Sequence, residues 1–280
     1  MSLLKTLPLT LVLAAAPVRA QSEDSAPQFP PVAEILGETA PLLPTAETAD
    51  LRDALRAMPP LQSELRALSS GSASRQRGAL ERLGEARNRR AAPYIGALLL
   101  QVNAPVQSRV SAATALGRIG DVDSVPFLER ATRDEVKEVR FAAALALGKT
   151  KSLDAVAALE TTLQNDPHWW VRYAAAVGLG DTRQPAAVPA LSRVLNEELR
   201  WQVRQQAARA LGQIGNQPAV AALGRALTDS DPTVRYSAAR ALGEIGGSES
   251  LDLMHAAYAA EKDPLPSGQL RASLRRASSR

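Results

Sequence analysis

Three tryptophans and two histidines are the side chains of this sequence whose types most favour binding or chemistry. Trp169, Trp170 and Trp201 are its only tryptophans. Tryptophan buries a large area with few rotatable bonds, so this group predicts an anchor for a binding partner. The alternative is that the rings cover the turns between helices and pack on the edge of the core. The two histidines, His168 and His255, are too few for a histidine-rich metal site.

The sequence lacks the residues that several catalytic classes require. It contains no cysteine, which excludes a disulfide scaffold, a cysteine-ligated metal and a cysteine nucleophile. It also shows no serine nucleophile elbow, no glycine-rich phosphate loop and no His-Glu metal pair. We therefore expect no catalytic residue, no cofactor and no metal site.

A second candidate binding feature is a set of arginines at equivalent positions of a repeated pattern. Arg130, Arg193 and Arg225 each follow the same glycine of that pattern by thirteen residues. They predict a broken basic stripe for a partner, which Thr161 interrupts. The alternative interpretation is an ordinary solvated face.

The pattern that positions these residues recurs about every 32 residues, and internal repeats decide the fold. The segment from Val139 to Gly148 returns almost unchanged at residues 171–180, 203–212 and 234–243, and more loosely at 108–117 and 75–84. One column of the repeat holds Ala79, Ala112, Ala143, Ala175, Ala207 and Ala238. Four residues later another holds Leu83, Leu116, Leu147, Leu179, Leu211 and Leu242. Positions i and i+4 share a helix face, so each unit begins with a helix that has a buried stripe.

A second helix follows each glycine. The apolar residues eleven positions after the glycine are Ile95, Leu128, Leu159, Leu191, Leu223 and Met254. One helix pair cannot bury its stripe alone, but stacked pairs form a continuous core. The sequence therefore predicts an all-α fold, a curved α-solenoid of about six stacked helix-turn-helix units over residues 72–265.

The repeated pattern Val-Arg-x-x-Ala-Ala-x-Ala-Leu-Gly resembles HEAT repeats, and its short, alanine-rich form is similar to the repeats of phycobilisome (bilin) lyases. The resemblance covers roughly residues 72–280 and is close at residues 234–243, which Asp231 and Pro232 precede. It implies that the second helices line a concave face. Deoxyhypusine hydroxylase is a HEAT-like enzyme whose metal is held by His-Glu motifs, and this chain has none.

The resemblance also bears on a column of arginines that stands beside a column of mostly acidic residues. The arginines are Arg109, Arg140, Arg172, Arg204 and Arg235. Six residues before them stand Asn103, Asp134, Asp166, Glu198 and Asp229. An anion-binding ridge is one interpretation. The resemblance implies the other, a structural ladder between repeats.

The two ends of the chain differ from the repeats. Residues 1–20 combine Lys5, an apolar stretch and the small residues of Val18-Arg19-Ala20, which predicts a secretory signal peptide cleaved after Ala20. Residues 21–49 are rich in proline and alanine and read as a flexible linker. Residues 50–71 predict N-terminal capping helices, at about 50–58 and 61–68, and residues 266–280 a C-terminal cap helix with a basic tail.

Charge argues against nucleic acid as a partner. The formal net charge of +4 falls to +2 without the signal peptide, and the four arginines of the last ten residues account for more than that excess. After removal of the signal peptide no stretch is suited to span a membrane. We expect an exported protein, periplasmic or secreted, that acts as a noncatalytic scaffold and binds a protein or peptide on its curved surface. The alternative is a chromophore- or ligand-handling protein that resembles a bilin lyase subunit.

Overall fold

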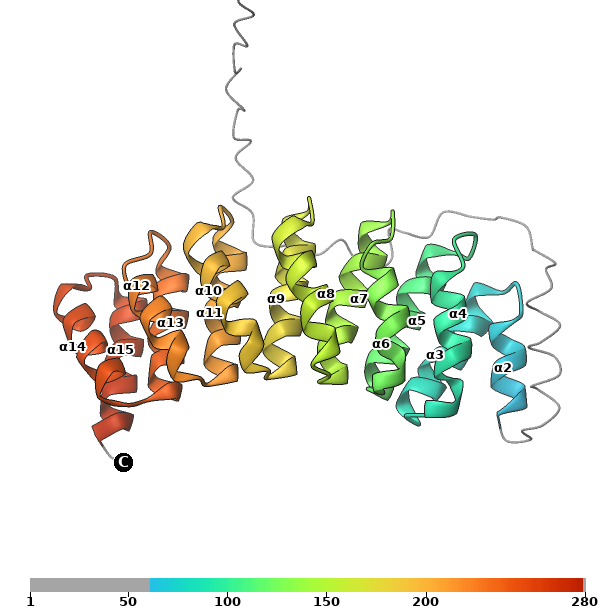
Figure 1. Ribbon diagram of the computed structural model, residues 1–280, viewed down its shortest axis with the longest axis horizontal. Coiled ribbons are helices and arrows are strands. Elements are labelled where there is room, and N and C mark those ends of the chain that lie inside the picture. The colour runs from blue at the N-terminus through green and yellow to red at the C-terminus, as the bar shows by residue number, and fades with distance from the viewer. Residues whose placement is uncertain (1–60, 279–280) are drawn as a thin grey trace, which may run out of the picture. The chain divides into compact units, whose positions relative to one another are not determined.

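The computed structural model describes residues 61–278, which form an array of helices (Figure 1). Within that range the chain contains fourteen α-helices and four short 3₁₀ helices, and no strand. The predicted all-α solenoid of stacked helix pairs is confirmed. The predicted signal peptide, the linker at 21–49 and the capping helix at 50–58 lie outside the described residues.

Six helix pairs correspond to the six sequence repeats. The first helices of the pairs are α3 (Ala73–Glu85), α5 (Val106–Ile119), α7 (Lys137–Thr150), α9 (Trp169–Thr182), α11 (Trp201–Ile214) and α13 (Pro232–Ile245). The second helices are α4 (Ala92–Leu100), α6 (Val125–Ala131), α8 (Asp154–Asn165), α10 (Val188–Glu197), α12 (Val220–Ala226) and α14 (Ser248–Ala260). The helix α2 (Gln62–Leu68) precedes the pairs and α15 (Pro264–Ser278) follows them. The 3₁₀ turns η2 (Arg89–Ala91), η3 (Val122–Ser124), η4 (Pro185–Ala187) and η5 (Gln217–Ala219) lead into four of the second helices.

The helices form two layers in which each member packs on the next of its own kind. First helices contact first helices from α3 to α13, and α15 continues this layer. Second helices contact second helices from α4 to α14, and α2 packs against α4 at the start of that layer. Each pair therefore lies beside the next one along the chain (Figure 1).

Different side chains set the distance between neighbouring helices in the two layers. Every residue of the alanine and leucine columns is buried between the layers. In the first layer small residues let neighbouring backbones approach: a Cβ added at Gly117 would lie 2.9 Å from the Cα of Ala146. In the second layer Phe127 and Leu253 fill the space over Gly96 and Gly224. Close-packed interiors tolerate little change in volume, so these columns set the distance between repeats.

A residue with positive φ follows the first helix in all six pairs. In three pairs it is a glycine, as at Gly120, Gly215 and Gly246, with φ between 65° and 73°. In the other three it is a basic residue, Arg87, Lys151 or Arg183, with φ between 47° and 55°. Glycine adopts positive φ without steric cost, whereas a side chain there is strained.

Replacing Lys151 by glycine is therefore expected to raise the free energy of unfolding by about 0.5–1 kcal/mol, because it removes that strain. Chemical denaturation followed by circular dichroism measures the change. Lys151→Ala is the matched control, since it removes the charge and keeps the Cβ. If both variants raised the free energy of unfolding equally, loss of the lysine charge, and not relief of backbone strain, would explain the increase.

The C-terminal helix α15 occupies the place of a seventh first helix. It begins at Pro264, earlier than the sequence pattern indicates, because the Asp263 carboxylate accepts a hydrogen bond from the Leu265 N–H at 3.0 Å. Its buried residues face α13, where the Ser273 hydroxyl donates to the Ala239 carbonyl at 3.1 Å. Thus α15 covers the last complete pair.

Candidate binding surfaces

The arginine and acidic columns meet in a row of ion pairs between successive repeats. Four of the arginines donate two hydrogen bonds to the carboxylate of the following repeat, whereas Arg109 pairs with Asp134 through one nitrogen and donates its Nε–H to the Leu99 carbonyl. The five pairs are Arg109–Asp134, Arg140–Asp166, Arg172–Glu198, Arg204–Asp229 and Arg235–Glu261. Four of these arginines also donate to the backbone carbonyl six residues earlier in their own repeat, at 2.9 Å. Bidentate pairs of this kind fix geometry as well as charge.

Three of the ladder carboxylates, those of Glu198, Asp229 and Glu261, have a pKa lowered from the ordinary value. For Asp229, burial raises the pKa, but hydrogen bonds from Arg204 and from the Asp231 N–H outweigh it, so the net pKa lies below its ordinary value. For Glu261 the hydrogen bond from Arg235 is the largest influence, and the pKa is again lowered. Because both partners are committed to each other, the ladder leaves no free charge for a bound anion.

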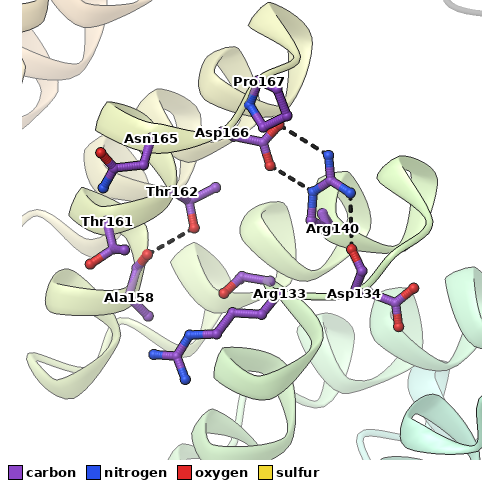
Figure 2. Close-up of a pocket in the computed structure, with 10 residues that line it drawn as sticks. Arg133, Asp134, Arg140, Ala158, Thr161, Thr162, Asn165, Asp166 and Pro167 are labelled. Atoms are coloured by element: carbon purple, nitrogen blue, oxygen red, sulfur yellow. Dashed lines mark hydrogen bonds and ion pairs between the residues drawn. The ribbon is translucent and has the colours of Figure 1, made fainter.

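A pocket of about 340 Å³ lies beside one ion pair of this ladder (Figure 2). It lies between the turn that precedes α7 and the C-terminal end of α8. Arg140 stands at one side and bonds Asp166 and the Asp134 carbonyl, while the Arg133 side chain extends away from it. Arg133 pairs with Glu129 of its own turn at 3.0 Å. The charged side chains that line this pocket are therefore already paired with one another or with neighbouring residues.

The three tryptophans lie at the start of two neighbouring first helices. Trp169 and Trp201 occupy equivalent positions on α9 and α11, and both are partly buried against the core. Trp170 faces the other way along the first layer and contacts Phe141 of α7, with ring centroids 4.8 Å apart. The structure thus places Trp169 and Trp201 at equivalent positions of neighbouring helices, each partly on the core and partly exposed, while Trp170 contacts α7.

The sequence reasoning missed an exposed apolar residue that lies two residues before Trp201 along the chain. Leu199, in the turn before α11, is 93% exposed, the most exposed large apolar side chain among the described residues. It precedes Trp201 by two residues and follows the ladder carboxylate Glu198. A leucine looks like a core residue in a sequence, and only its place outside the buried columns could have indicated this. Leu199, Trp169 and Trp201 together are called the apolar edge below.

The arginines of the expected stripe are exposed, and they project from α6, α10 and α12. One acidic residue, Glu160, interacts with Arg193 of this stripe. Burial raises the pKa of Glu160 on α8, and the charge of Arg193 opposes that increase. Thr161 is exposed and occupies the same repeat position in the pair between those of Arg130 and Arg193. The stripe is therefore a mixed surface with separated positive charges.

The remaining chemistry-bearing residues are dispersed. His168 and His255 are both exposed and belong to different repeats. No group of three or more His, Asp or Glu residues within residues 61–278 is arranged to hold a metal ion. In the same range no helix combines the length and the apolarity that a membrane crossing needs.

Comparison with known proteins places the repeats in a family. The HEAT-repeat family matches residues 97–180, 126–204 and 197–275. No curated protein matches the chain.

Several solved structures are similar to this chain at low sequence identity. Human deoxyhypusine hydroxylase in complex with glycerol is 23% identical, covering 84% of this chain and 92% of that one, with a TM-score of 0.41. The complex of CpcE and CpcF of phycocyanin lyase from Nostoc sp. PCC7120 is 23% identical, covering 91% and 99%, with a TM-score of 0.48. A designed armadillo repeat protein in complex with the peptide (KR)4 is 18% identical, covering 65% and 99%, with a TM-score of 0.48.

Proposed function

Because the chain belongs to the HEAT-repeat family, we propose that it is a noncatalytic scaffold that binds a protein or peptide partner through the apolar edge. The supporting observation is Leu199, which is 93% exposed in the turn before α11, two residues before the partly exposed Trp201. Exposing a large apolar side chain next to aromatic rings is unfavourable in water, and such groupings are typical of binding sites. The dispersed histidines and the paired ladder charges support a role without catalysis.

Export is part of the proposal and rests on the leader pattern of residues 1–20. Native mass spectrometry of the protein isolated gently from its own host tests both parts. We expect a chain that begins at Gln21 and a second polypeptide bound in fixed ratio. An intact N-terminus would contradict export. A bound chromophore with visible absorbance would favour the ligand-handling alternative instead.

The apolar edge can be tested with the partner recovered in that experiment. Leu199→Ala is expected to weaken its binding by about tenfold, as loss of a binding anchor does. Stability should stay within about 0.5 kcal/mol of the unmodified protein, since the side chain is exposed. Isothermal titration calorimetry and thermal denaturation measure the two quantities.

Val102→Ala is the matched control, because Val102 is 74% exposed in the turn before another first helix. It should bind the partner as the unmodified protein does. Equal affinities of the Leu199→Ala and Val102→Ala variants would place the binding surface elsewhere on the solenoid.

A further inference from the structure

The end of the solenoid at α14 and α15 presents apolar and basic side chains where the earlier repeats bury apolar and small ones. In each earlier pair the second helix is covered by the next second helix. The residues fifteen positions after the repeat glycine show this: Leu99, Thr132, Leu163, Leu195 and Leu227 are all buried. Their counterpart on α14 is Tyr258, which is 38% exposed. No helix within residues 61–278 follows α14 in its layer.

A second position on α14 shows the same difference. The residues eight positions after the repeat glycine, Val125, Val156, Val188 and Val220, are buried in the four preceding pairs. Leu251 is their counterpart and is partly exposed. Leu251 and Tyr258 therefore form an apolar strip on α14, on the side where each earlier second helix receives the next one.

The neighbouring helix α15 has arginines at positions where the earlier first helices have alanine or glycine. Arg271 replaces the column of Ala113, Ala144, Ala176, Ala208 and Ala239, which is fully buried by the following first helix. Arg275 replaces the glycine column through which neighbouring backbones approach. Both arginines are exposed, and neither forms an ion pair with residues 61–278. A further first helix could not pack here without burying two charges.

We propose that this end surface, formed by Leu251, Tyr258, Arg271 and Arg275, binds an amphipathic helix of a partner protein that carries acidic residues beside its apolar stripe. The apolar stripe packs on α14 in the manner of a next second helix, and the acidic residues pair with the arginines of α15. The continuity of the second-helix layer supports a helix as occupant, and the two unpaired positive charges support an acidic one.

The arginines also argue against a second copy of this chain as the occupant. A two-fold contact would place the surface against itself and bring four arginines together. The acidic residues of α14 do not offset this charge. Glu249 and Asp252 belong to columns that are exposed in every pair, so they lie on the outer side of the layer and not at its end.

The test uses the full chain and a fluorescent designed peptide of about five helical turns, made of alanine and leucine with glutamates beside the leucine stripe. A second peptide has lysine in place of every glutamate. Fluorescence anisotropy at low salt is expected to show at least about tenfold tighter binding of the glutamate peptide. Arg271→Glu combined with Arg275→Glu should reverse that preference, and Tyr258→Ala should weaken the binding of both peptides.

The control replaces Arg193 and Arg225 by glutamate, which changes the net charge equally on exposed positions away from this end. It should leave the preference for the glutamate peptide intact, and circular dichroism verifies that each variant is folded. Absence of binding, equal binding of the two peptides, or an equal effect of the control would overturn the proposal. So would a concentration-dependent dimer, seen by analytical ultracentrifugation, that Tyr258→Ala abolishes. None of these outcomes depends on the apolar edge.

Discussion

Replacing Gly148 by alanine is expected to lower the free energy of unfolding by about 2 kcal/mol, although alanine favours a helix more than glycine does. A Cβ at this position of α7 would lie 2.6 Å from the carbonyl oxygen and 2.9 Å from the carbonyl carbon of Gly178 on α9. The obstacle is backbone, which cannot move aside as a flexible side chain can. The two helices must separate, and this opens the layer in the middle of the array.

Urea denaturation followed by circular dichroism measures this effect. Gly268→Ala is the matched control, because Gly268 also lies within a helix but a Cβ there would meet no atom within 4 Å. It should raise stability by about 0.5–1 kcal/mol through helix propensity alone. If both variants gained stability, the first helices would be separable without cost and the packing of α7 on α9 would not set the repeat spacing.

The contact between Gly148 and Gly178 shows how far the sequence predicts the fold. The glycine and leucine columns predict the number of pairs, their two helices and the buried stripe, because periodicity reports which side chains share a face. They do not say which residue of the next helix each glycine meets. That depends on the stagger between neighbouring helices, to which every side chain in the contact contributes, and no single column encodes it.

The ladder and the apolar edge show the same limit for the surfaces. For four of the five ladder arginines, the sequence places an acid six residues before the arginine in the same repeat. In the structure that arginine bonds the backbone carbonyl of this residue and the carboxylate of the next repeat, Glu261 included. Which carboxylate an arginine contacts in the next repeat depends on how the repeats stack. For Leu199, exposure depends on the turn that holds it, whereas a leucine in a sequence favours a buried position.

Breaking one ion pair of the ladder is expected to lower the free energy of unfolding at least as much as Gly148→Ala does. Asp229→Asn should cost about 2–4 kcal/mol at neutral pH, because it removes the charge that compensates Arg204. The carboxylate accepts both guanidinium bonds, at 2.8 and 2.7 Å, and the Asp231 N–H at 2.9 Å. The side chains of the pair are only 12% and 10% exposed, so water cannot replace the lost partner well.

Acid should abolish the difference between the two proteins, and this separates the charge from the shape of Asp229. The folded-state pKa of Asp229 lies below its ordinary value of 3.8, so its contribution is complete above about pH 4. It is lost as the pH falls through the folded pKa, whereas asparagine does not titrate. Stabilities measured by urea denaturation between pH 7 and pH 3 should therefore converge at low pH. Glu244→Gln, in the exposed pair with Arg240, should cost only about 0.3–0.5 kcal/mol at pH 7. A constant difference for Asp229→Asn across this range would mean that packing, and not the ion pair, holds the repeats together at this rung.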